Sequence, residues 1–135
     1  MHAERTFWEK ATAIHVFCLQ VRLRGDRFSR HWHDIVRLDD IGLSDSAIAD
    51  RELASAVAKH KSMFFAEKAA DRSPIDYEAA VSGNLVLTPV GEGRAALEED
   101  YSRMVGDGLL LDDAETFDEL IERCAAICGK ANAAA

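Results

Sequence analysis

The sequence predicts a mainly α-helical fold, a helical bundle of about five helices with one or two short extended segments. Three features support this prediction. Apolar residues recur at helical spacing in several stretches, strand-like segments do not alternate with them, and glycines or helix-capping residues separate the stretches. A length of 135 residues suits one domain with its own core, so we expect residues 1–135 to form a single helical domain.

The first helix is predicted from about Thr6 to Leu23, and Gly25 follows it. Thr6 and Glu9 match a capping box, in which each side chain accepts a hydrogen bond from the other residue's backbone amide. One face of this helix is apolar because residues of that kind recur at helical spacing: Phe7, Ala11, Ile14, Cys18 and Val21. Lys10 lies beside this apolar face.

The second helix is predicted from about Arg30 to Asp40, with Ser29 as its N-cap and Gly42 after its end. Its buried stripe is expected to contain Phe28, Trp32, Ile35 and Val36. Asp34 lies next to that stripe. We expect both tryptophans of the chain, at positions 8 and 32, to pack in the core.

The remaining elements are a short helical turn ending at Ala49, three helices and one extended piece. The helices are expected at Arg51–Phe65, Arg94–Val105 and Thr116–Gly129, and the extended piece at Leu85–Pro89. Thr116 and Glu119 match a second capping box. The alanine-rich tail from position 131 is expected to fray.

The composition is that of a globular protein, and its charge is unevenly spread. The net charge is −8, yet residues 1–38 hold seven Lys or Arg against four Asp or Glu. An anionic ligand would therefore prefer the N-terminal third of the chain. No apolar run approaches the ~20 residues of a membrane span. The three cysteines follow no secretory or metal-binding pattern, so we expect a cytoplasmic protein with reduced, mostly buried cysteines.

Lys10 and Asp34 are the residues that the sequence marks for chemistry. Lys10 could neutralise phosphate groups, or it could be an ordinary solvated lysine on a helix. Asp34 could hold a substrate, or it could simply be favoured near the start of its helix by the helix dipole. Because each residue borders a buried stripe, we expect the two side chains to share one solvent-reachable cleft between the two helices.

Arginines gather at the connection between the first two helices: Arg22, Arg24, Arg27 and Arg30. Guanidinium groups match phosphate geometry, so Arg27 and Arg30 are candidates for nucleotide or phosphate binding, although a solvated loop explains them equally well. His31 and His33 are two positions apart, which places them on different faces of a helix. No metal site is therefore expected from them.

Six short motifs occur in this order along the chain: RTFWEK (5–10), SRHWHD (29–34), IADREL (48–53), HKSMFF (60–65), LTP (87–89) and TFDEL (116–120). Together they resemble the C-terminal helical half of the AbiEii/AbiGii-type nucleotidyltransferase toxins, which belong to type IV toxin–antitoxin and abortive-infection systems. The resemblance covers nearly the whole chain. It implies that the family's functional lysine and aspartate fall on Lys10 and Asp34.

The resemblance also implies what the other half of such an enzyme does. In the family an N-terminal half with a small sheet, a Gly-Ser motif and paired acidic residues binds Mg²⁺ and the nucleoside triphosphate (NTP). The present sequence has no Gly-Ser motif, and we expect that half to be absent, with no cofactor bound by this chain alone. An apolar surface near Phe7 and Trp8 would then be left exposed.

Two functions follow from this comparison. The first is a partial toxin, the substrate-side half of an enzyme that transfers a nucleotide from NTP to an acceptor such as tRNA, and we expect this half to be inactive alone. Its partners would be a separate N-terminal nucleotidyltransferase half, a cognate antitoxin and tRNA. The alternative is a non-catalytic helical module that binds an antitoxin or another protein.

Overall fold

The computed structural model describes residues 3–20, 28–108 and 115–135. Helices dominate these ranges, and they hold no β-strand, only an isolated bridge between Lys68 and Pro74. The helices are α1 (Ala3–Gln20), α2 (Arg30–Asp40), α3 (Leu43–Ala49), α4 (Arg51–Phe64), α5 (Tyr77–Val81), α6 (Gly91–Gly106) and α7 (Phe117–Ala134). The predicted mainly α class is confirmed.

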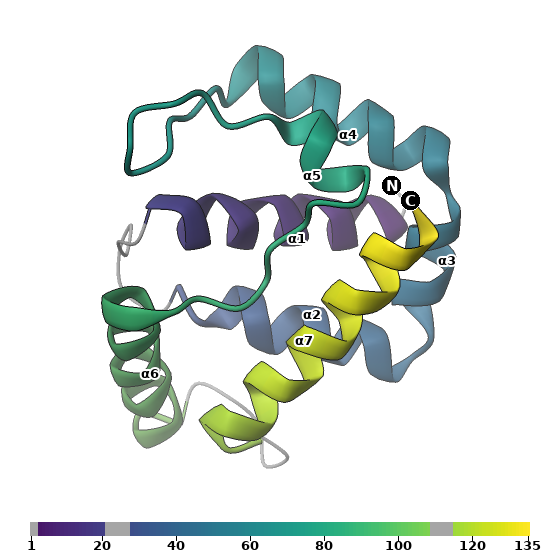
Figure 1. The fold of residues 1–135 in the computed structure, drawn as a ribbon. Coiled ribbons are helices and arrows are strands. Elements are labelled where there is room, and N and C mark those ends of the chain that lie inside the picture. Colours follow the sequence, from purple (N-terminus) through teal and green to yellow (C-terminus); the bar gives the residue numbers. More distant parts are fainter. Residues whose placement is uncertain (1–2, 21–27, 109–114) are drawn as a thin grey trace.

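Helix α1 lies in the middle of the molecule, between α4 and α2 (Figure 1). Phe7, Trp8, Ala11 and Ile14 are fully buried along it. The indole Nε1 of Trp8 donates a hydrogen bond to the carbonyl of Ala47 in α3 at 2.8 Å. The prediction of an exposed apolar surface at Phe7 and Trp8 is therefore wrong, because α3 and α4 pack against α1 and cover these side chains.

The start of α1 also differs from the prediction. The helix already begins at Ala3, so Thr6 lies inside it and does not serve as its N-cap. Residues 3–5 extend the helix by about one turn, and Arg5 Nε lies 3.6 Å from Glu9 Oε2, one turn further on. Such pairs at i, i+4 favour the helical state. Lys10 consequently lies deeper within the helix than the predicted start would place it.

Helix α2 has the predicted bounds, but Ser29 does not cap it with its side chain. The Ser29 hydroxyl instead donates to the Met104 sulfur at 3.0 Å, and the Ser29 backbone amide donates to Asp100 Oδ2 at 2.9 Å. All three residues are buried. Helix α6 therefore holds in place the residue that immediately precedes α2.

The segment that was expected to be extended, Leu85–Pro89, carries no regular secondary structure and connects with both central helices. Trp32 Nε1 donates to the Leu87 carbonyl at 2.8 Å, and His15 Nδ1 accepts from the Val86 amide at 3.0 Å. These bonds satisfy backbone groups that would otherwise lack a partner in the interior. Trp32, like Trp8, is fully buried, so core packing of both tryptophans is confirmed.

The C-terminal helices are longer than predicted. Helix α6 begins at Gly91. Helix α7 begins at Phe117, and the predicted capping box of Thr116 and Glu119 is present at its start. Helix α7 continues to Ala134 instead of ending near Gly129. The Asn132 side chain explains the extra turn, because it bonds both the amide and the carbonyl of Leu85. Helix α5 was not predicted; the Asp76 carboxylate caps it by accepting from the Ala79 amide.

All three cysteines are free thiols, as expected. Cys124 is buried, while Cys18 and Cys128 are half-buried. Burial raises the pKa of Cys18 to about 12, so this thiol stays protonated at neutral pH. Among the helices in the described ranges, none combines the length and apolar character that a membrane crossing requires.

Candidate functional site

Lys10 and Asp34 form an ion pair between α1 and α2. Lys10 Nζ lies 3.0 Å from Asp34 Oδ2, at hydrogen-bonding distance. Their side chains are 23% and 28% exposed, so solvent reaches both groups. The end of α1 and the start of α2 lie at the same end of the molecule (Figure 1), and the two residues meet because each lies near the middle of its helix.

The packing of the two helices fixes this pair at the edge of the core. Lys10 is followed by fully buried Ala11, and Asp34 is followed by fully buried Ile35. Each polar side chain therefore leaves its helix at the boundary between core and solvent, where a lysine can keep its ammonium group hydrated. The sequence expectation that the two side chains come together is met by this contact.

Arg30 adds a second cation to the same carboxylate. Its Nε lies 3.9 Å from Asp34 Oδ2, one turn earlier on α2, and the side chain is 62% exposed. Two cations thus share one carboxylate, and the group of three carries a net positive charge. Arg27, the other predicted phosphate ligand, lies outside the described residues, as do Arg22 and Arg24.

His31 and His33 point into different surroundings, as their spacing predicts. The His31 ring packs edge-on against Phe28, with 4.7 Å between the ring centres. Burial lowers the pKa of His31, and the charge of Lys10 lowers it further. Burial also lowers the pKa of His33, with a further contribution from Arg37. Both imidazoles are therefore neutral at neutral pH.

These residues do not fit a magnesium ion. Mg²⁺ prefers several oxygen ligands, whereas Asp34 offers one carboxylate that Lys10 and Arg30 already neutralise. Across the ranges that the structure describes, no group of three or more His, Cys, Asp or Glu side chains could hold a metal. What this cluster offers is positive charge beside a carboxylate, which suits a phosphate group or another anion.

A family model described as "Nucleotidyl transferase AbiEii toxin, Type IV TA system" matches residues 1–123. This chain belongs to the AbiEii family. Neither the curated proteins nor the solved structures gave a match to it. This match confirms the resemblance that the sequence motifs indicated. Membership in a type IV toxin–antitoxin family implies an antitoxin as a partner.

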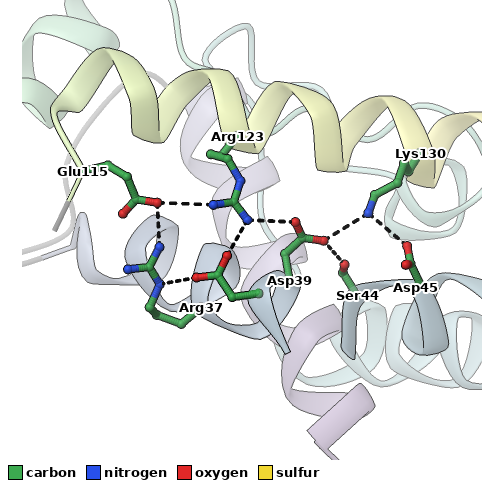
Figure 2. Close-up of polar contacts among 8 residues, drawn as sticks. Arg37, Asp39, Ser44, Asp45, Glu115, Arg123 and Lys130 are labelled. Atoms are coloured by element: carbon green, nitrogen blue, oxygen red, sulfur yellow. Dashed lines mark hydrogen bonds and ion pairs between the residues drawn. The ribbon is translucent and has the colours of Figure 1, made fainter. Parts of the chain in front are cut away.

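A larger charged network holds α2 of this AbiEii-family chain against α7 (Figure 2). Arg123 of α7 lies 2.7 Å from Asp40 and 3.0 Å from Asp39, both at the end of α2. Arg37 of α2 in turn lies 2.6 Å from Glu115, which precedes α7. Charged partners therefore cross between the helices in both directions, so that α2 cannot slide along α7 without breaking several of them.

The network continues along α7 to α3. Lys130 lies 3.0 Å from Asp39 and 2.9 Å from Asp45. Burial alone would raise the pKa of Asp39, but hydrogen bonds from Ser44, Lys130 and Arg123 outweigh it and lower that pKa. Sequence reasoning missed this network. The only local signal was the spacing of Arg123 and Lys130, seven residues apart, which places them on one face of a helix.

Proposed function

We propose that this chain is the substrate-side helical part of a nucleotidyltransferase toxin, in which Lys10 and Asp34 take part in nucleotide transfer. The Lys10–Asp34 pair is the observation that carries the proposal. It places a lysine and an aspartate from separate helices in contact, at a solvent-reached position, in a chain of the AbiEii family.

The chemistry of transfer explains why such a pair is useful. Nucleotidyl transfer moves negative charge among phosphate oxygens, so catalysis relies on positioned cations more than on covalent chemistry. Lys10 would face the transferred nucleotide, and Asp34 would hold the lysine side chain in position. Arg30, partly free at the rim, would contribute a phosphate contact, and Arg27 is proposed for the same role.

The nucleoside triphosphate and Mg²⁺ are proposed to bind to a nucleotidyltransferase half other than the helices described above. That half could be a separate polypeptide, and the chain is proposed to be inactive without it. Support comes from the cluster itself, whose single carboxylate is already paired with two cations. The proposed acceptor is an RNA such as tRNA, and the proposed regulator is the cognate antitoxin.

Transfer of labelled nucleotide tests this function. The purified chain is incubated with labelled NTPs, Mg²⁺ and total tRNA, with and without a co-expressed nucleotidyltransferase half. We expect label on the RNA only when both halves are present, and its loss in Lys10→Ala. Arg103→Ala is the matched control, because Arg103 is an exposed cation on α6.

Two results would contradict the proposal. Transfer by the chain alone would show that it holds the whole catalytic apparatus, and a reconstituted enzyme indifferent to Lys10→Ala would remove the role of the pair. If the combined halves stay inactive while the chain binds its antitoxin, the non-catalytic interaction module is the better description.

A further inference from the structure

The C-terminal end of α4 exposes three consecutive large apolar side chains. Met63 is 75% exposed, Phe64 66% and Phe65 53%. The other large apolar side chains that are exposed in the described ranges occur singly: Ile41, Val90 and Val105. Single exposed apolar residues are ordinary, whereas a contiguous exposed group marks a contact surface.

Cations and aromatic rings alternate around this group. Residues 59–68 contain three lysines and one glutamate, in a chain with a net charge of −8. Lys61 Nζ lies 5.2 Å from the centre of the Phe65 ring, and the His60 ring lies 4.9 Å from that of Phe64. Among the described residues none of the three lysines forms an ion pair within 4.0 Å, although the charges of Glu9 and Glu67 act on Lys61.

A small pocket lies behind this surface, with a volume of about 160 Å³. Three aromatic rings, one cation, one carboxylate and two small or branched apolar side chains line it: Phe28, Phe65, Tyr77, Lys61, Glu67, Ala13 and Val16. The Tyr77 hydroxyl donates a hydrogen bond to the Phe65 carbonyl at 2.7 Å. Tyr77 therefore contributes its ring to the lining of the pocket. The volume is below the several hundred Å³ of a drug-sized site, and suits one planar ring system.

The pocket lies about one helical turn along α1 from Lys10. Ala13, which also lines it, lies one turn after Lys10 on α1. Phe28 lines the pocket on one side and packs against His31 on the other. The charges of both Lys10 and Lys61 act on His31, so these three residues gather on one side of the molecule. A ligand that occupied the pocket would therefore lie about one helical turn from Lys10.

We propose that the end of α4, residues 59–68, binds single-stranded nucleic acid. Unpaired bases stack on Phe64 and Phe65, one base enters the pocket, and Lys59, Lys61 and Lys68 contact phosphates. Cations interleaved with exposed rings are what a strand of stacked bases and charged phosphates requires. This rests on the proposed function, since it assigns the acceptor's unpaired end a place beside Lys10.

Binding of a labelled single-stranded RNA of about ten nucleotides tests the proposal, because platforms of this kind hold strands of about that length. Fluorescence anisotropy would compare the unmodified chain with Phe64→Ala and Phe65→Ala. We expect about tenfold weaker binding for each, the usual effect of removing one stacking ring. Val90→Ala and Val105→Ala, which truncate exposed apolar residues elsewhere, should change the affinity by less than about twofold.

Two controls sharpen the test. Lys61→Gln should make binding less sensitive to salt, because one phosphate contact is lost. A duplex RNA of the same length should bind more weakly than the single strand, since its bases are already stacked. Circular dichroism would verify that the exposed substitutions leave the helices folded.

Several results would overturn the proposal. These are unchanged binding in both phenylalanine variants, equal binding of the duplex, or loss of antitoxin binding with RNA binding intact, which would make the surface a protein interface. The measurement needs neither NTP nor a second enzyme half. Lys10-dependent transfer combined with normal RNA binding by both phenylalanine variants would thus defeat this inference and leave the proposed function standing.

Discussion

Lys10 and Asp34 lie 24 positions apart in the chain, yet their side chains meet at 3.0 Å on the surface of the central helix pair. A partly exposed ion pair of this kind contributes only about 0–1 kcal/mol to stability. The proposed role of the pair in nucleotide transfer can therefore be tested by substitution without unfolding the chain.

The first prediction separates stability from activity at this pair. Lys10→Ala should lower the free energy of unfolding by less than about 1 kcal/mol. Asp34→Asn should behave similarly, since Arg30 and Lys10 then lose only one partner. Urea unfolding followed by circular dichroism measures both values. A loss of several kcal/mol would mean that the pair is a structural element.

The second prediction concerns the two buried indoles. Trp8→Phe removes the hydrogen bond to the Ala47 carbonyl and leaves a small void in the core. We expect a loss of about 2–3 kcal/mol in unfolding free energy, from the unsatisfied carbonyl and the missing atoms. Trp32→Phe should cost a similar amount through the Leu87 carbonyl. The same urea titration measures both, and an effect below about 0.5 kcal/mol would contradict the structure.

The third prediction compares the charged network with an isolated surface pair. Arg123→Met should destabilise the fold by about 1–2 kcal/mol, because Asp39 and Asp40 lose a shared partner. Arg94→Met is the matched control. Its partner Asp118 is 83% exposed, and the Arg94 guanidinium also lies 5.1 Å from the centre of the Phe117 ring, so its loss should cost less than about 1 kcal/mol. Equal losses in the two variants would show that the network acts as separate pairs.

The fourth prediction is a pH dependence that His15 contributes. Burial lowers the pKa of His15 to about 4 in the folded chain, whereas the unfolded chain keeps an ordinary value near 6.5. Below pH 6.5 the unfolded state binds the proton first, so stability falls as the pH decreases, until the folded pKa is reached. The loss between pH 7 and pH 4.5 should be about 2 kcal/mol from this residue.

His15→Asn supplies the control for that experiment. Asparagine keeps an acceptor for the Val86 amide but does not titrate. We expect the variant to be less stable at pH 7 and to lose less stability on acidification than the unmodified chain. His31 and His33 also have lowered pKa values, so part of the dependence should remain. An unchanged slope would show that His15 does not contribute to it.

Local sequence patterns predicted most of the helices. The apolar repeat of α2 gives the observed bounds of that helix, and the capping box at Thr116 gives the observed start of α7, because their determinants lie within a few residues. The patterns failed where distant groups decide. Ser29 is an excellent N-cap by type, but Asp100 and Met104 engage it, and Asn132 lengthens α7 by bonding Leu85.

The candidate site was likewise predicted only in part. The buried stripes beside Lys10 and Asp34 indicated that the two residues face each other, and the contact at 3.0 Å agrees. The exposed surface at the end of α4, which contains Phe64 and Phe65, was not predicted. On the predicted helix Phe64 lies on the same line as Leu53, Val57 and Lys61, and this line reads as a buried face. Whether the last turn of α4 is exposed depends on which parts of the chain pack against it, and a local sequence pattern does not give that information.

The hydrogen bonds on either side of residues 21–27 have one more consequence. Before this stretch the Leu19 carbonyl accepts from the Ala70 amide at 2.9 Å, and after it Ser29 is fixed to α6. The end of α1 is thus hydrogen-bonded to Ala70, and the start of α2 is hydrogen-bonded to α6. The relative position of α1 and α2, and with it the Lys10–Asp34 contact, is therefore set by distant parts of the chain as well as by the direct link between the two helices.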